Sequence, residues 1–214
     1  MCGRVGLGKE QRYAIDQRYD LVLSRLNLQR RYNVPPSLSV PLLYDAQGEP
    51  GAVMAKWGLV PFWSSDGKGW SNARGETVHE KPAFRSAFKQ RRGVIVVDHF
   101  FEWQAMGHKV KKQPWLFTRA DEQPMLMAAL WEPGDPPTAT IVTINANDWM
   151  TPIHDRMPVI LETEELDRWM RGTQEEARAL IQPGADGVLQ RQPVSTLVST
   201  GREDAACIDP ITID

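Results

Sequence analysis

The sequence contains little cysteine, which excludes a small domain held together by disulfide bonds. Only Cys2 and Cys207 are present, at opposite ends of a chain of 214 residues. Two such distant thiols make neither a disulfide framework nor a CxxC-type zinc site. A chain of this length buries enough apolar surface to fold without cross-links. We therefore expect one domain, residues 1–214, without a metal ion or cofactor, acting as a monomer in a reducing cytoplasm with no obligate protein partner.

Long apolar runs are also absent. The first residues, MCGRVGLGKE, become charged before an apolar stretch of signal-peptide length develops. No later run is long enough to span a bilayer. A membrane partner is therefore not expected.

An excess of charge of one sign is missing too. The chain has 25 basic and 27 acidic residues, a net charge of −2, whereas nucleic-acid-binding domains are more often strongly basic. Basic residues do gather in the segments 25–31, 89–92 and 109–112, and acidic residues gather late, at 162–167 and 175–176. This asymmetry allows one basic face, although each cluster taken alone is equally typical of a solvated surface.

Short apolar runs separated by proline are what the sequence does have. Its 16 prolines fall mostly between such runs, a pattern typical of short strands joined by turns. We expect strands at 38–44, 52–60, 93–104, 114–120, 125–132, 138–145 and 193–199. Together they predict a curved, mostly antiparallel, barrel-like sheet.

Helical periodicity occurs in four segments around these strands. They are residues 9–27, 82–92, 162–172 and 173–184. Pro82 suits the first position of the second helix, and Thr173 with Glu176 forms a capping box at the start of the last. The predicted fold class is therefore α+β, with peripheral helices around the sheet.

The first four residues carry unusual chemistry. A small residue at position 2 allows Met1 to be removed, which leaves the α-amine and the thiol of Cys2 on one residue. The amine can attack an aldehyde to give an imine, and the thiol can then close a five-membered thiazolidine ring. An α-amino group titrates at about 7.7 to 8.0, so a useful fraction is uncharged at neutral pH. Taken alone, however, a cysteine after the initiator is more often only a small residue.

Eight short motifs follow one another along nearly the whole chain. They are MCGR at 1–4, RYNVPPS at 31–37, WGLVPFW at 57–63, SNARGET at 71–77, KPAFR at 81–85, FFEW at 100–103, IHDRMPVIL at 153–161 and QPVS at 192–195. No single motif is specific. Their combination and order resemble the SRAP family (SOS response-associated peptidase), whose mammalian member is a sensor of abasic sites.

This resemblance implies that the protein detects abasic sites in single-stranded DNA, including sites at junctions with a duplex, and cross-links to them. Cys2, as the mature N-terminus, is expected to form the thiazolidine with the ring-opened sugar. Asn72 is expected to hold Cys2 and the sugar-phosphate, while Glu102 and His154 handle protons during ring opening, imine formation and reversal. Lyase activity through the same imine and removal of Met1 by the protein itself are further expectations.

The resemblance also implies a surface for DNA. Pro36, Phe62 and Trp63 resemble the family's wedge, which stacks on an exposed base and excludes the opposite strand. Three arginines are expected to follow the phosphate backbone, with Arg74 in direct contact with phosphate, so that binding weakens as salt rises. They are Arg4, Arg74 and Arg156.

The residue types fit these roles. A closed abasic sugar must lose one proton and gain another before its aldehyde is exposed, and a carboxylic acid partly desolvated beside Phe101 and Trp103 would have a raised pKa suited to this. His154 titrates in the right range for a proton shuttle. The alternatives are that Glu102 is an exposed strand residue and that His154 forms a structural hydrogen-bonded pair with Asp155.

Three other histidines have no motif support, and three tryptophans lie in strand-like runs. We expect structural roles for His79, His99 and His108, and core positions for Trp57, Trp115 and Trp131. One segment departs from the family pattern, because TLVSTGRED follows QPVS where an asparagine-bearing ending is expected. A backbone or phosphate contact near Ser199 and Thr200 is therefore expected to differ.

Two other functions remain open on the residues alone. In one, Cys2 is the N-terminal nucleophile of a thiol amidase or peptidase, with Glu102 and His154 as acid-base partners; repeated cleavage of an amide would identify it. In the other, the chain only binds single-stranded DNA, and Cys2→Ala would leave binding unchanged.

Overall fold

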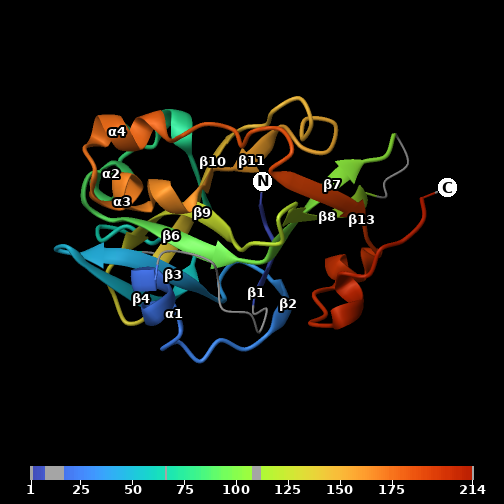
Figure 1. Ribbon diagram of the computed structural model, residues 1–214, viewed down its shortest axis with the longest axis horizontal. Coiled ribbons are helices and arrows are strands. Elements are labelled where there is room, and N and C mark those ends of the chain that lie inside the picture. Colours follow the sequence, from blue (N-terminus) through green and yellow to red (C-terminus); the bar gives the residue numbers. More distant parts are fainter. Residues whose placement is uncertain (1, 8–16, 66, 108–111, 214) are drawn as a thin grey trace.

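Two sheets form the body of the molecule, and the computed structural model describes residues 2–7, 17–65, 67–107 and 112–213 of it (Figure 1). The smaller sheet has the strand order β13-β8-β7-β1-β2. Its strands are β1 (Val5–Leu7), β2 (Arg31–Val34), β7 (His99–Ala105), β8 (Lys112–Arg119) and β13 (Leu189–Pro193). All its pairings are antiparallel.

The larger sheet closes on itself. Its order is β11-β10-β4-β3-β6-β9-β12, and β10 pairs with β9 as well as with β4, so five strands form a ring. The strands are β3 (Ser39–Ala46), β4 (Glu49–Trp57), β6 (Arg92–Val97), β9 (Met125–Glu132), β10 (Thr138–Asn145), β11 (Arg156–Pro158) and β12 (Ile160–Leu161), with β5 (Asn72–Arg74) parallel to β10. The predicted α+β class and the mostly antiparallel, barrel-like sheet are confirmed.

The expected strand at 93–104 is two strands in two sheets. The chain breaks at Asp98, whose backbone N–H donates to the carbonyl of Gly6, and passes from β6 to β7. Every residue of β6 is buried, because alternate side chains enter different clusters: Val94 and Val96 face the helices, while Ile95 and Val97 face the ring interior. Burial on both faces explains the unbroken apolar run.

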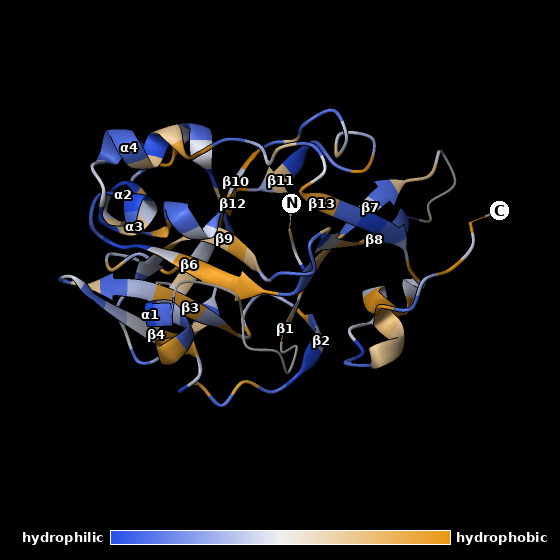
Figure 2. Ribbon diagram, in the orientation of Figure 1, coloured by the Kyte–Doolittle hydropathy of each residue, from blue (hydrophilic) through white to orange (hydrophobic). Residues whose placement is uncertain are grey.

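Four short helices of the described residues lie around the larger sheet, and Figure 2 shows α4 as mostly hydrophilic and β6 as apolar. They are α1 (Gln17–Leu23), α2 (Arg85–Gln90), α3 (Leu166–Arg171) and α4 (Gln174–Ala179), with 3-10 turns η1 (Gly75–Thr77), η2 (Thr163–Glu165), η3 (Thr196–Thr200) and η4 (Ala205–Cys207). The capping box of Thr173 and Glu176 on α4 is confirmed. No helix among the described residues is long and apolar enough to cross a membrane.

Two boundaries were predicted wrongly. Pro82 lies in turns that precede α2, which begins three residues later, at Arg85. The last strand is expected at 193–199, whereas β13 ends at Pro193. Most of the expected segment forms η3, where the Ser195 hydroxyl accepts from the backbone N–H of Leu197. A serine that caps a turn in this way competes with strand pairing. Residues 9–16 of the first expected helix lie outside the described residues.

The expected core residues are placed as follows. Trp57 is fully buried, whereas Trp115 and Trp131 are partly buried against the same cluster. His99 is buried, with Nε2 3.0 Å from the carbonyl oxygen of Tyr32, which gives it a packing role. His79 is half-buried beside Glu80, and His108 lies outside the described residues.

Candidate active site

The N-terminal segment enters the interior of the fold. Figure 1 shows this end of the chain at the centre of the molecule, where β1 lies between β2 and β7. Val5 pairs with Val34 on one side and with Phe100 on the other. This strand carries Cys2 into the cluster shared by both sheets, where it is fully buried.

Asn72 holds the backbone of Cys2. The Asn72 side-chain Nδ2 donates to the carbonyl oxygen of Cys2 at 2.9 Å. Asn72 is positioned by β5, in which it pairs with Ile141 of β10. Its Oδ1 is buried and accepts no hydrogen bond from the described residues, so an acceptor is available beside Cys2.

Glu102 is a buried carboxyl group on β7. It is 2% exposed, although Trp115, its partner on β8, and Trp103, the next residue along β7, are only partly buried. Burial raises the pKa of Glu102 to about 7. The carboxyl is therefore distributed between its acid and its base form at neutral pH, which is the condition for a group that both donates and accepts protons.

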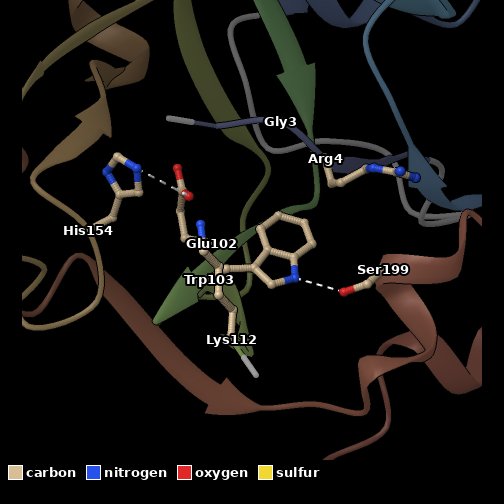
Figure 3. A pocket seen from close by; sticks show the side chains of 7 residues that line it. All are labelled: Gly3, Arg4, Glu102, Trp103, Lys112, His154 and Ser199. Atoms are coloured by element: carbon tan, nitrogen blue, oxygen red, sulfur yellow. Dashed lines mark hydrogen bonds and ion pairs between the residues drawn. The ribbon is translucent and has the colours of Figure 1, made fainter. Parts of the chain in front are cut away.

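His154 faces Glu102 from the loop before β11, as Figure 3 shows. Its Nε2 lies 3.9 Å from the Glu102 carboxylate. At the other ring nitrogen, the backbone N–H of Arg156 donates to Nδ1 at 3.0 Å, and a carboxylate oxygen of Asp155 lies at 2.9 Å. Burial lowers the pKa of His154. The neutral imidazole with its proton on Nε2 can accept the hydrogen bond from the Arg156 N–H at Nδ1, whereas the imidazolium can donate from Nδ1 to the Asp155 carboxylate.

A cavity of about 460 Å³ opens onto this pair. Its lining residues come from the segment before β1, from β7, β8 and η3, and from the loop of His154, and are Gly3, Arg4, Glu102, Trp103, Lys112, His154 and Ser199 (Figure 3). The Trp103 indole N–H donates to the Ser199 hydroxyl at 2.8 Å. The atypical segment after QPVS thus contributes to this cavity. Lys112, which belongs to one of the basic clusters, was not singled out from the sequence.

The thiol of Cys2 is held in its neutral form. Burial raises its pKa far above the ordinary value, and the nearby Glu102 carboxylate acts in the same direction. A thiol in this state is a weak nucleophile, so its reaction requires a base that removes the proton as the sulfur attacks. Glu102 is the charged side chain that couples to it.

The expected DNA contacts lie at the surface, with one exception. Phe62 is 79% exposed and Trp63 is 52% exposed, Arg74 is exposed on β5, and Pro36 is half-buried. Arg4 is half-buried and donates to the Asn33 side chain at 3.2 Å.

The exception is Arg156, which is 7% exposed. Its guanidinium donates to the Glu76 carboxylate at 2.9 Å, to the Thr143 carbonyl at 2.7 Å and to the Asn145 side chain at 2.6 Å. These bonds tie η1 to β10 and β11, and they direct the guanidinium into the protein instead of toward a phosphate. Glu76, which sequence reasoning missed, could have been suspected from its place in the SNARGET motif.

A metal site is not formed by the residues that the structure describes. No three side chains of the types His, Cys, Asp and Glu come together there in a group that could hold an ion.

Comparisons of the sequence with known proteins point to one family. The sequence model of the family described as SOS response associated peptidase (SRAP) matches residues 1–201. The abasic site processing protein YoqW of Bacillus subtilis is 32% identical over 96% of this chain and 97% of its own length. The abasic site processing protein YedK of Escherichia coli is 37% identical over 66% of this chain and 64% of its own, and HMCES of Gallus gallus is 30% identical over 85% and 66%.

Solved structures share the fold. A crystal structure from Bacteroides thetaiotaomicron superimposes with a TM-score of 0.74 at 22% identity, covering 90% of both chains. Another, from Bordetella bronchiseptica, has a TM-score of 0.74 at 24% identity and covers 91% of this chain and all of its own. The family match over almost the whole sequence, with relatives above 30% identity along it, shows that the chain belongs to the SOS response associated peptidase (SRAP) family.

Proposed function

We propose that this protein recognises abasic sites in single-stranded DNA and bonds to them covalently through Cys2. The observation that carries the proposal is the position of Cys2, held by Asn72 and beside the Glu102–His154 pair. The relatives named abasic site processing proteins support the choice of substrate.

The reaction begins after Met1 has been removed, because the nitrogen of Cys2 is otherwise an amide and cannot form an imine. The free amine adds to the aldehyde carbon of the open sugar, and the resulting carbinolamine loses water to give an imine. The Cys2 sulfur then adds to the imine carbon, its proton passes to nitrogen, and a thiazolidine ring closes. No oxidant or cofactor is required.

Glu102 is the proton carrier in these steps. As an acid it protonates the departing hydroxyl of the carbinolamine, and as a base it takes the proton of the buried Cys2 thiol. A pKa of about 7 gives it both forms at neutral pH. His154, with Nε2 3.9 Å away, exchanges the proton with Glu102 and with the sugar oxygens. The free Asn72 oxygen accepts a hydrogen bond from the attacking amine or the sugar hydroxyl.

Two further activities follow from the same groups. The imine acidifies the hydrogen on the neighbouring sugar carbon, and its removal expels the 3′ phosphate, which is a lyase reaction. Glu102 couples to Cys2, and His154 lies beside Glu102, so we also propose that this pair assists hydrolysis of the Met1–Cys2 peptide bond, which would make the protein its own peptidase.

Binding of the strand uses the exposed residues. Arg4 and Arg74 contact phosphates, while Pro36, Phe62 and Trp63 form an apolar projection that stacks on the last base pair at a junction with duplex DNA. Arg156 is left out of this set, since its guanidinium is committed to Glu76 and β10.

The test is to mix the purified protein with single-stranded DNA that carries one abasic site, and to follow a denaturing gel and intact mass. We expect an adduct that lacks Met1, persists without a reductant and is lost in Cys2→Ala. Cys207→Ala is the matched control, because it removes the other buried thiol. An adduct formed by Cys2→Ala at the unchanged rate would overturn the proposal.

A second candidate is a thiol amidase or peptidase, and the family description contains the word peptidase. It would require the Cys2 thiol to be activated in the resting protein, whereas burial holds this thiol protonated. Many turnovers of a peptide substrate by catalytic protein, with no adduct on abasic DNA, would favour the amidase.

A further inference from the structure

A second concavity, with different walls, reaches Asn72, the residue that bonds to the Cys2 backbone. This groove of about 410 Å³ is lined by Trp63, Trp70, Asn72, Arg74, Thr77, Lys81, Pro82, Ala83 and Phe84. Asn72 belongs to its lining and also bonds to the Cys2 backbone. The reacting residue is therefore in contact with this groove through Asn72 and coupled to the polar cavity through Glu102.

The wall of the groove is aromatic and fixed. Trp70 packs edge-on against Phe84, with ring centroids 6.3 Å apart and planes at 83°. The Trp70 backbone is held by two hydrogen bonds with Leu59, and Phe84 is 8% exposed. Trp63, half exposed, forms the outer edge. Such a surface can receive a flat aromatic ring without rearrangement, and aromatic stacking accepts any base.

The rim of the groove is cationic. Arg74 on β5 and Lys81 in the turn before α2 both line it and are exposed. Neither side chain is paired with a carboxylate among the residues that the structure describes. A fixed aromatic wall beside two cations without a counter-charge is complementary to a nucleotide, which has an apolar face at one end and a phosphate at the other.

The polar cavity has a different surface. Its indole ring, Trp103, shares the lining with the polar or charged side chains of Arg4, Glu102, Lys112 and His154. The two concavities therefore differ in what they can bind.

We propose that the groove binds the nucleotide next to the abasic sugar on one side only, with its base against Trp70 and Phe84 and its phosphate between Arg74 and Lys81. This inference rests on the proposed function and makes it more specific. The protein then recognises a missing base together with one intact neighbouring base, and the neighbour on the other side is not read.

The experiment compares three single strands with one abasic site each: one with both neighbours intact, one with the 5′ neighbour replaced by a baseless tetrahydrofuran spacer, and one with the 3′ neighbour so replaced. The rate of the Cys2-dependent adduct is measured at protein concentrations below saturation. We expect one replacement to slow the reaction about tenfold or more, as the loss of one stacked base would, and the other to change it less than about twofold. Equal rates for the two replacements would overturn the inference.

Variants place the effect in the groove. Lys81→Gln is expected to slow adduct formation and to flatten its salt dependence, because one phosphate contact is lost. Lys89→Gln is the matched control, since Lys89 is an exposed lysine of α2 outside the groove lining, and it should leave both unchanged. Thermal melting of each variant checks that the fold is intact. An unchanged rate and salt dependence in folded Lys81→Gln would contradict the phosphate contact.

Failure of the two proposals can be told apart. If the wild-type protein forms no adduct on any of the strands, the covalent function fails. The groove is then tested by the anisotropy of labelled strands without an abasic aldehyde, comparing a fully based strand with one built only of baseless spacers. Equal affinity for these two strands would reject the groove as a base-binding site, and tighter binding of the based strand would support it.

Discussion

The two concavities near Cys2 differ in the chemical groups that line them. The cavity around Glu102 and His154 is lined by polar groups and holds a carboxyl with a pKa of about 7. The groove around Trp70 is apolar with a cationic rim. Proton transfer is favoured by a desolvated polar site, whereas base stacking is favoured by an apolar aromatic surface. One surface therefore cannot be optimal for both. Changes on one side should alter rate, and changes on the other should alter affinity.

Removal of the thiol gives the largest expected effect. Cys2→Ser retains the α-amine, so the imine can form, but the oxygen closes a less stable ring. We expect the adduct to disappear from a denaturing gel, by about 100-fold or more, and to return when borohydride reduces the imine. Binding to DNA measured by anisotropy should stay within about twofold. A stable adduct in Cys2→Ser without reductant would contradict the role of sulfur.

The cavity side is tested by Glu102→Gln. We expect the adduct to form about 100 to 1,000 times more slowly, in the range of general acid–base catalysis, with little change in DNA affinity. The wild-type rate should change with pH around 7, the pKa to which burial raises Glu102, and this inflection should vanish in the variant. Gln104→Glu, also on β7, is the control for a change of charge on the same strand and should keep the inflection.

The same substitution has a consequence for stability. The folded pKa of Glu102, about 7, lies above its ordinary value of 4.5, so the folded protein binds more protons than the unfolded chain between these pH values. Wild-type stability should therefore fall as pH rises from about 4.5 to about 7, and Glu102→Gln should lack this component. Melting temperatures of both proteins across this range measure it. A constant difference between them would show that Glu102 is not desolvated.

The two arginines of the NAR and HDR motifs should separate stability from binding. Arg156→Ala leaves the half-exposed Glu76 carboxylate unpaired and removes bonds to β10, so we expect a loss of about 2 to 4 kcal/mol and a lower melting temperature. Arg74→Ala should leave the melting temperature unchanged and reduce the slope of log affinity against log salt by about 1. A normal melting temperature with reduced salt dependence in Arg156→Ala would show instead that Arg156 contacts DNA.

The smallest effect is expected at the edge of the cavity. Ser199→Ala removes the acceptor of the Trp103 indole N–H, which costs about 0.5 to 1.5 kcal/mol if water does not replace it. This bond orients the Trp103 ring in the cavity lining, so its loss should slow adduct formation. The effect should be no more than about threefold, because a single hydrogen bond is lost. Ser199→Thr restores an acceptor and is the control.

Local features of the amino-acid sequence predicted the fold class and a candidate chemistry. A cysteine at position 2, the eight ordered motifs and the short proline-separated apolar runs were enough to expect an α+β domain and a reactive N-terminus. These features are local, since strand alternation, capping residues and the chemistry of an α-amine beside a thiol depend on neighbours in the chain. The residues expected at the reacting centre, Asn72, Glu102 and His154, do lie around Cys2.

The strand boundaries and side-chain environments that depend on residues far apart in the chain could be seen only in the tertiary structure. The run at 93–104 divides between two sheets because Asp98 bonds to Gly6, which no local pattern records. An arginine in a short sequence motif can face DNA or a carboxylate. Arg156 pairs with a carboxylate, because the fold brings Glu76 to it from 80 positions away. The pKa of Glu102 follows from burial produced by both sheets together. Long-range packing sets the environment of each group, and the environment decides its role.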